Sequence, residues 1–226
     1  MSDELSYIAD TSHAAVARPD QPASAREAIL ADATEMCEIA FGHEVAGDLE
    51  SAKVWYRRAA ELGDTTAMCD LATIFLIDGD VDNALAWFDV AATAGSNAAR
   101  CELGGLLERL GEAERAKRAY QAAVDESYPE AMHWLGRMLL AEGQTEAAVD
   151  LLKTAADRYW SPSMYELGNW MFELDRVRDA KHWYLRAASE GHCEAMLALA
   201  SVLERMGDDE NAAEWRRHAV QDHNLA

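Results

Sequence analysis

The chain contains 226 residues, of which 50% are hydrophobic, and it carries a formal net charge of −21. This hydrophobic content allows a buried core along the whole chain. The acidic excess argues against nucleic-acid binding, because contact with a phosphate backbone requires clustered Lys and Arg. It favours either simple solubility or attraction to a basic partner.

No stretch of sequence approaches the roughly 20 apolar residues that a membrane span requires. The first residues, Met1–Leu5, have neither the basic nor the apolar region of a secretion signal. We therefore expect a cytoplasmic protein that does not bind membranes.

Residues 1–23 are polar and show no hydrophobic periodicity, which predicts an N-terminal tail that is disordered or loosely attached. A helix signal follows, because Ser24 and Glu27 have the spacing of a capping box. The helix that begins here either continues through Met36 or breaks near Thr34, and the sequence leaves both possibilities open. We predict a single helical-repeat domain over residues 24–226.

From Met36 onward the sequence repeats every 32 residues without a gap. The six units start near residues 36, 68, 100, 132, 164 and 196. A constant period of this size predicts a solenoid, in which each unit buries its apolar face against its neighbours. We number the positions within each unit from 1 to 32, beginning at these residues.

Each unit begins with an amphipathic helix, here called helix A. Positions 1, 4, 5 and 8 are apolar or small in most units, and they follow the spacing of one buried helical stripe. Position 12 is glycine in every unit except the fifth, which has Asp175. This column predicts that helix A ends at a residue with left-handed backbone conformation.

A second helix, helix B, follows the acidic or polar residues of that turn. Alanine fills positions 17 and 24 in all six units, and positions 20 and 21 are bulky in most. We expect the small residues at positions 5, 17 and 24 to let the two helices approach closely. Position 28 is glycine in three units. In the third and fourth units Pro129 and Pro162 mark the turn instead, with Ser161 as the expected helix cap.

These columns resemble the tetratricopeptide repeat, through Leu-Gly at positions 4 and 5, Ala at 17, an aromatic at 21 and Ala at 24. Residues 55–63 (WYRRAAELG) and 183–191 (WYLRAASEG) are still more similar to the Sel-one-like variant. The period is shorter than the roughly 34 and 36 residues of those two repeats. The resemblance covers residues 36–226. It implies an all-α solenoid of antiparallel helix pairs, a right-handed superhelix, a bacterial source and a protein-binding role.

Three cysteines, Cys37, Cys69 and Cys101, occupy position 2 of consecutive units. Equivalent helices of neighbouring repeats lie on the order of 8–10 Å apart. Zinc needs thiolate sulfurs within about 4.6 Å, and a disulfide needs Cα atoms within about 7 Å. We therefore predict free thiols and no metal. The segment 78–82, DGDVD, resembles the start of a calcium loop, but Asn83 stands where such a loop requires glycine.

The sequence has no paired-histidine zinc helix, phosphate loop, nucleophile elbow or Cys–His site. We predict a protein that is not an enzyme and that binds no cofactor.

The candidate binding surface lies on the side of helix A that carries positions 2, 6, 9 and 13, about 100° from the buried stripe. In tetratricopeptide proteins this side lines a concave groove, and the resemblance implies that extended peptides bind there. In the first three units these positions hold small or apolar residues and acids. In the fourth and fifth units they bring together donors and aromatic rings, namely His133, Arg137, Tyr165, Asn169 and Phe172.

His133, Arg137 and Asn169 are suited to hold a carboxylate or backbone carbonyls, and Tyr165 and Phe172 to anchor a side chain. The set loosely resembles the clamp of two basic residues and one Asn by which some tetratricopeptide domains hold a C-terminal carboxylate. The simpler alternative is an ordinary solvated groove wall. The residues Trp134, Trp160 and Trp170 lie outside the core columns, and we expect them to be exposed contact residues.

Three functions are compatible with this pattern. The first is a non-catalytic adaptor that binds a protein or peptide with basic and apolar residues. The second is an acidic regulatory inhibitor, or antitoxin-like decoy, of a basic protein, and the third is a structural subunit of a larger assembly. Salt separates the first two, because binding by charge alone weakens as ionic strength rises, whereas binding through aromatic side chains persists.

Overall fold

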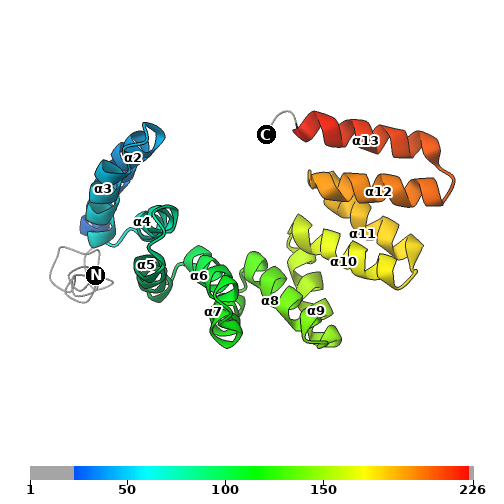
Figure 1. Ribbon diagram of the computed structural model, residues 1–226, viewed down its shortest axis with the longest axis horizontal. Coiled ribbons are helices and arrows are strands. Elements are labelled where there is room, and N and C mark those ends of the chain that lie inside the picture. The colour runs from blue at the N-terminus through cyan, green and yellow to red at the C-terminus, as the bar shows by residue number, and fades with distance from the viewer. Residues whose placement is uncertain (1–22, 224–226) are drawn as a thin grey trace. The chain divides into compact units, whose positions relative to one another are not determined.

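The computed structural model describes residues 23–223, and it describes side chains for residues 32–221. This part of the chain forms twelve α-helices and no β-strand (Figure 1). The predicted all-α fold is therefore confirmed. The predicted tail lies outside the described residues except for Ala23, where the first helix begins. None of the described helices is long and apolar enough to cross a membrane.

The helices alternate between the two kinds that the sequence predicts. Helices A are α2 (Ala23–Val45), α4 (Thr65–Ile77), α6 (Asn97–Arg109), α8 (Pro129–Ala141), α10 (Ser161–Glu173) and α12 (Cys193–Arg205). Helices B are α3 (Leu49–Glu61), α5 (Val81–Thr93), α7 (Ala113–Asp125), α9 (Thr145–Asp157), α11 (Val177–Ser189) and α13 (Asp209–His223). From α5 onward each helix begins 32 residues after the previous helix of its kind, so the sequence period is also the structural period. Helix α2 runs unbroken through Thr34 and Met36.

The turns between helices contain residues with a left-handed backbone conformation, and these are not always glycine. Position 12 has positive φ in every unit, including Asp175 at 57°. Position 28 has positive φ at Ser127 (63°) and Tyr159 (64°) as well as at the glycines. Such a conformation is unfavourable for residues other than Gly, Asn and Asp, so at Ser127 and Tyr159 the geometry of the turn overrides residue preference.

One predicted detail of these turns, the helix cap at Ser161, is wrong. Pro129 and Pro162 lie in the first turn of α8 and α10, and Ser161 is the first residue of α10. The N-cap position belongs to Trp160, which makes no side-chain capping bond. Trp160 is at position 29 of its repeat, the position that also precedes helix A in the earlier repeats. There Asp64 is the cap and accepts a hydrogen bond from the Ala67 amide at 2.8 Å. The 32-residue period therefore fixes where the cap lies.

The chain divides into two compact halves, each larger than one 32-residue repeat, with the boundary inside α7. We call residues 1–119 unit 1 and residues 120–226 unit 2; these numbered units are not single repeats. In unit 1 each helix from α2 to α6 packs on the next, and in unit 2 each helix from α8 to α13 does the same. Each unit therefore buries its apolar stripes between neighbouring helices, as a repeat architecture requires.

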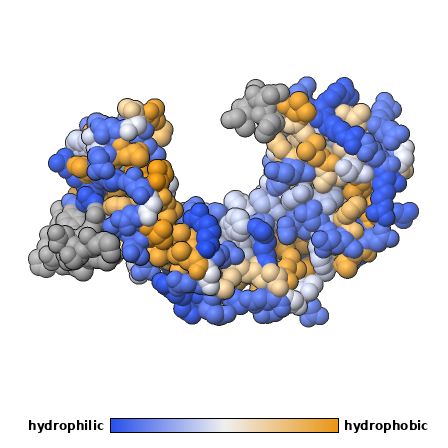
Figure 2. Space-filling view, viewed as in Figure 1, coloured by the Kyte–Doolittle hydropathy of each residue, from blue (hydrophilic) through white to orange (hydrophobic). Residues whose placement is uncertain are grey.

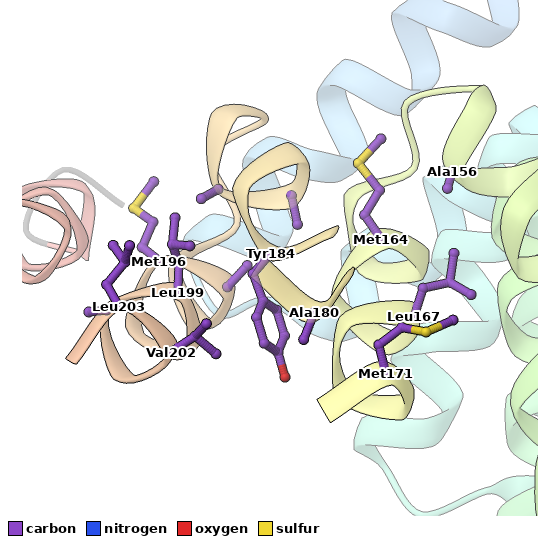
Figure 3. Close-up of a cluster of buried hydrophobic side chains, with 14 of the residues drawn as sticks. Ala156, Met164, Leu167, Met171, Ala180, Tyr184, Met196, Leu199, Val202 and Leu203 are labelled. Atoms are coloured by element: carbon purple, nitrogen blue, oxygen red, sulfur yellow. The ribbon is translucent and has the colours of Figure 1, made fainter. Parts of the chain in front are cut away.

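The core of unit 2 shows why small residues recur at position 5. Figure 3 shows Tyr184 of α11 among buried side chains of α10 and α12. A Cβ atom on Gly168 of α10 would lie 2.5 Å from the Tyr184 ring, closer than atoms can approach. Glycine at this position therefore lets the aromatic ring of the following helix B lie directly against the backbone of helix A.

Candidate functional site

The seven predicted site residues lie in unit 2, on two consecutive helices A. His133, Trp134 and Arg137 are on α8, and Tyr165, Asn169, Trp170 and Phe172 are on α10. Residues 133 and 165 share repeat position 2, and residues 137 and 169 share position 6. The structure places part of this set at the surface and turns the rest towards the protein.

His133 is a packing residue, which corrects its predicted role as a ligand contact. Its side chain is buried, with 6% exposure, and its Nδ1 lies 3.2 Å from the Ser163 hydroxyl of α10. Burial lowers the pKa of His133 to about 4, and the nearby Arg137 and His192 side chains add to the effect. The ring is therefore neutral at pH 7, and it joins α8 to α10 instead of offering a charge to a partner.

Arg137 is exposed, and its guanidinium lies over the ring of Trp134 at 5.1 Å from the centroid. The indole nitrogen of Trp134 in turn points towards a Glu130 carboxylate oxygen at 3.4 Å. Arg137 forms no ion pair with any carboxylate in the described part of the chain. A cation held over an aromatic face keeps its N–H donors available for a carboxylate or carbonyl.

Tyr165 lies half-buried against a residue that the sequence did not suggest. Its ring stacks on His192, with centroids 4.8 Å apart and planes inclined by 24°. His192 is the N-cap of α12, where its Nδ1 accepts a hydrogen bond from the Ala195 amide at 3.3 Å. Burial lowers the pKa of His192 and so favours the neutral ring that this bond needs. Position 29, the capping position in the preceding repeats, was the available sequence signal for His192.

Asn169 is half-buried and faces both the protein and the solvent. Its Oδ1 accepts a hydrogen bond from the Tyr184 hydroxyl at 2.8 Å. Burial, as the main cause, raises the pKa of Tyr184 to about 12, so the phenol remains a donor at neutral pH. With its oxygen engaged, Asn169 retains its amide N–H groups as donors for a partner.

Phe172 is 38% exposed at the end of α10. The guanidinium of Arg205, from α12, lies 5.5 Å from its ring centroid and also pairs with Asp175 at 2.7 Å. The three tryptophans that the sequence suggested as exposed contacts, Trp134, Trp160 and Trp170, are all half-buried instead. Trp170 packs against the core between α10 and α12, because its helix position lies at the edge of the buried stripe.

The accessible part of the site thus consists of Arg137, Tyr165, Asn169 and Phe172, here called the unit 2 surface. It combines a guanidinium and a carboxamide, both hydrogen-bond donors, with two aromatic rings. Donors of this kind bind carboxylates and backbone carbonyls, and exposed rings bind apolar side chains. The arrangement is suited to recognition of a polypeptide.

None of the four cysteines forms a disulfide, which agrees with the prediction for Cys37, Cys69 and Cys101. Burial raises the pKa of both Cys37 and Cys69 to about 11, with nearby carboxylates adding to the effect. These thiols therefore stay protonated at neutral pH and are poor nucleophiles.

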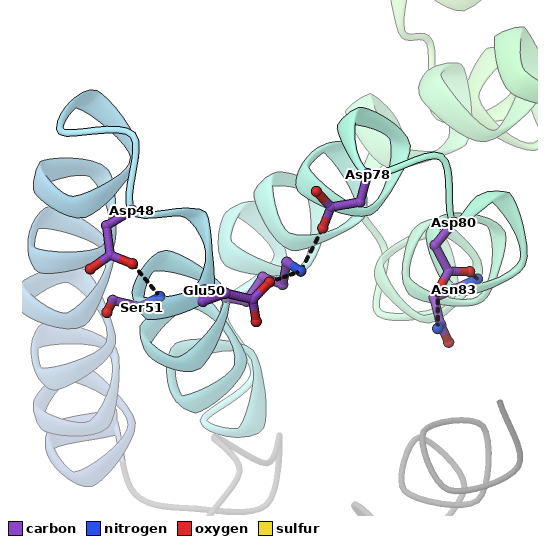
Figure 4. A network of polar contacts seen from close by, with 7 residues as sticks. Asp48, Glu50, Ser51, Asp78, Asp80 and Asn83 are labelled. Carbon is purple, nitrogen blue, oxygen red and sulfur yellow. Dashed lines mark hydrogen bonds and ion pairs between the residues drawn. The ribbon is translucent and has the colours of Figure 1, made fainter.

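The acidic segment 78–82 has roles in the fold (Figure 4). Asp80 is the N-cap of α5 and accepts hydrogen bonds from the amide and side-chain nitrogens of Asn83, at 3.2 and 2.8 Å. Asp78 pairs with Lys53 of α3 at 2.5 Å. Within the described side chains, no group of three His, Cys, Asp or Glu residues is arranged to hold a metal ion.

Comparison with solved structures shows the fold of known repeat proteins. A Sel1 repeat protein from Oxalobacter formigenes is 22% identical, with 84% of this chain and 87% of that chain covered and a TM-score of 0.68. Pseudomonas aeruginosa pilF is 18% identical, with 83% and 90% covered and a TM-score of 0.65. A protective antigen of uropathogenic Escherichia coli with an SLR fold is 22% identical over 86% of this chain, with a TM-score of 0.67. This chain spans 47% of that antigen's length.

None of the curated proteins matches the sequence. Among protein families, the tetratricopeptide repeat matches residues 43–99 and 101–161, and the Sel1 repeat matches residues 161–192. The first of these alone covers more than half of the chain, and both agree with the helix pairs described above. The chain therefore belongs to the tetratricopeptide repeat family, and it includes a segment of the Sel1 type.

Proposed function

We propose that the protein is a non-catalytic adaptor that binds a protein or peptide through the unit 2 surface. Repeats of these families typically form scaffolds for protein–protein interaction. The observation that carries the proposal is Arg137, an exposed guanidinium without an acidic partner in the described structure, at the repeat position that Asn169 occupies on the next helix A.

The partner segment offers a carboxylate or backbone carbonyls to Arg137 and Asn169 and an apolar side chain to Tyr165 and Phe172. Arg137 is held in place by Trp134, and Asn169 by Tyr184, so both donors are positioned before a partner arrives. Positioning in advance reduces the entropy lost on binding.

The direct test is capture of partners from the native cell extract by chemical crosslinking, using the variant Arg137→Gln with Phe172→Ser. The control is Arg178→Gln with Leu185→Ser, which makes the same kinds of change at exposed positions of α11, a helix B in the same unit. We expect the first variant to lose its crosslinked partners and the control to keep them.

Both variants should unfold within about 0.5 kcal/mol of the natural protein, since all four side chains are at the surface. Equal capture by the two variants would overturn the assignment of the unit 2 surface.

The Ser163–His133 pair resembles part of a hydrolase site, but it gives no support for catalysis. Ser163 and His133 are within hydrogen-bonding distance, but both side chains are buried, and neither can reach a substrate. Ser163 also occupies position 32, which is alanine in the neighbouring units, as at Ala131 and Ala195. Its small size serves helix packing, and His133 satisfies its hydroxyl.

A second candidate function, inhibition of a basic protein, is favoured by the net charge of −21. A complex held by charge alone dissociates as salt is raised and the screening length falls from about 10 Å towards 3 Å. The capture is therefore repeated with high salt present before the crosslinker is added: a partner that is still crosslinked favours the adaptor, and its loss favours the inhibitor.

We also propose a cytoplasmic location. The absence of a disulfide at any of the four cysteines supports it, because thiols persist in a reducing compartment and tend to be oxidised outside it. Cell fractionation with thiol labelling tests the proposal, and recovery of the protein in an extracellular fraction would contradict it.

A further inference from the structure

Unit 1 carries three large apolar side chains that are well exposed. Phe41 and Val45 lie one turn apart on α2, with 60% and 73% of their surfaces exposed, and Ile77 on α4 is 61% exposed. Val45 and Ile77 share repeat position 10, so the three residues, here called the apolar strip, follow the same side of consecutive helices A. Figure 2 shows hydrophobic surface along one side of this unit, next to hydrophilic residues.

Among the described side chains of these two helices A and their caps there are acids but no Lys or Arg. Residues 32–48 and 64–80 contain nine acids and no Lys or Arg, namely Asp32, Glu35, Glu38, Glu44, Asp48, Asp64, Asp70, Asp78 and Asp80. The basic residues of the first repeat, Lys53, Arg57 and Arg58, are all on helix B. In the first repeat the Lys and Arg residues are therefore confined to helix B, while the described charges of helix A are acidic, and a surface evolved only for solubility would not require this separation.

Three of these acids, Glu44, Asp64 and Asp70, are half-buried and influence one another. Glu44 accepts a hydrogen bond from the Tyr56 hydroxyl at 2.9 Å, and Asp64 caps α4. Burial, together with the charges of Glu44 and Asp64, raises the pKa of Asp70 to about 6. None of the three pairs with a Lys or Arg in the described structure.

We propose that the apolar strip and the carboxylates of Glu44, Asp64 and Asp70 form a second docking surface, which binds an amphipathic segment of another protein that presents apolar side chains together with Lys or Arg. Apolar side chains of the partner cover Phe41, Val45 and Ile77, and its cations neutralise the carboxylates. This surface lies wholly in unit 1 and has the opposite charge to Arg137 of the unit 2 surface.

The negative charge beside the apolar strip favours a cationic partner over a second copy of this chain or an anionic membrane. A second copy of this chain would bring a like-charged surface against it, and an anionic membrane would be repelled for the same reason. A cationic partner gains attraction from carboxylates that are already partly removed from water, where a charge interaction is stronger than on an exposed surface.

The probe is a synthetic amphipathic helical peptide of about 15 residues, with Leu on one face and Lys on the other. Its affinity for the full chain is measured by fluorescence anisotropy. Two matched peptides serve as controls, one with Glu in place of Lys and one with Ser in place of Leu. We expect binding of the Leu–Lys peptide to be at least about tenfold tighter than that of either control, because each control lacks one of the two complementary features.

Three variants locate the binding. Phe41→Ser with Ile77→Ser should weaken binding about tenfold, and Asp70→Asn should weaken it several-fold. Asp89→Asn makes the same charge change on the exposed surface of α5, a helix B of the same unit, and should have little effect. Asp70→Asn should also leave the melting temperature unchanged or raise it at neutral pH. The raised pKa means that ionised Asp70 destabilises the free protein, so a lower affinity cannot be ascribed to unfolding.

The proposal is overturned if the Glu control or the Ser control binds as tightly as the Leu–Lys peptide. Equal weakening by Asp70→Asn and Asp89→Asn would also overturn it, because attraction would then come from net charge alone. A dimer of the free protein that is lost in the Phe41→Ser, Ile77→Ser variant would assign the strip to self-association instead. Arg137→Gln with Phe172→Ser should leave peptide binding unchanged, which keeps this result independent of the unit 2 surface.

Discussion

At the scale of single residues, His133 couples the fold to pH. Its ring is buried, and its pKa is lowered to about 4, whereas an unperturbed histidine has a pKa of about 6.5. Between these values the unfolded chain binds a proton that the folded chain does not. The free energy of unfolding therefore rises with pH in this window, and the contribution is lost as pH falls from about 6.5 towards 4.

We expect His133 to reduce the free energy of unfolding by about 2 kcal/mol between about pH 7 and pH 5, since each pH unit below the unfolded pKa is worth about 1.4 kcal/mol. Urea unfolding of the natural protein and of His133→Asn at the two pH values measures this. The carboxylates titrate in both proteins, so the difference between their pH responses isolates the histidine. Identical pH responses would show that the pKa of His133 is the same in the folded and the unfolded chain.

At the scale of helices, the packing of helix B on helix A depends on position 5. Gly168 faces the ring of Tyr184, and Gly136 faces the side chain of Leu152. A Cβ atom would lie 2.5 Å from the rigid ring in the first case and 3.0 Å from a flexible side chain in the second. The same substitution should therefore have different effects in adjacent repeats.

We expect Gly168→Ala to lower the free energy of unfolding by about 1–3 kcal/mol, as overpacking of a core does. Gly136→Ala should cost less than Gly168→Ala, because Leu152 can shift and alanine favours the helix by about 1 kcal/mol over glycine, although the Ala148 carbonyl oxygen, 3.3 Å from the added Cβ, is fixed. Thermal or urea unfolding of the two variants gives the comparison. A loss at Gly136→Ala as large as that at Gly168→Ala would contradict the role of the Tyr184 ring.

At the scale of the whole molecule, the dominant property is the net charge of −21 over 226 residues. An excess of one sign destabilises a folded protein through self-repulsion. The acids of residues 32–48 and 64–80 are the clearest case, because these two segments contain no Lys or Arg. Most ion pairs of the described structure are at exposed surfaces, where each contributes little.

We expect the melting temperature to rise when NaCl is increased from about 0.05 to about 0.5 M, because screening removes repulsion between acids more than it weakens the few surface ion pairs. Differential scanning calorimetry measures the change. A fall in melting temperature would indicate that attractive pairs outweigh repulsion in the folded chain.

Much of the architecture was predictable from the spacing of small and apolar residues. The alternation of helices A and B and the left-handed residues at position 12 follow from columns that recur every 32 residues. The cap at Ser161 was predicted wrongly, since the choice rested on the chemistry of one residue and the period places the cap at Trp160. Where local preference and the repeat disagree, the repeat prevails, because packing against neighbours stabilises more than one capping bond.

The sequence by itself determined the helices, their order and the side of helix A on which Arg137, Tyr165, Asn169 and Phe172 lie, because helical periodicity depends only on residues close along the chain. Only the tertiary structure decided how far each of them is available. His133 is buried against Ser163, 30 residues away, and Tyr165 is only partly covered by the stacked ring of His192, 27 residues away. Burial and hydrogen bonding of a side chain depend on atoms from the next repeat, and no pattern within one helix specifies them.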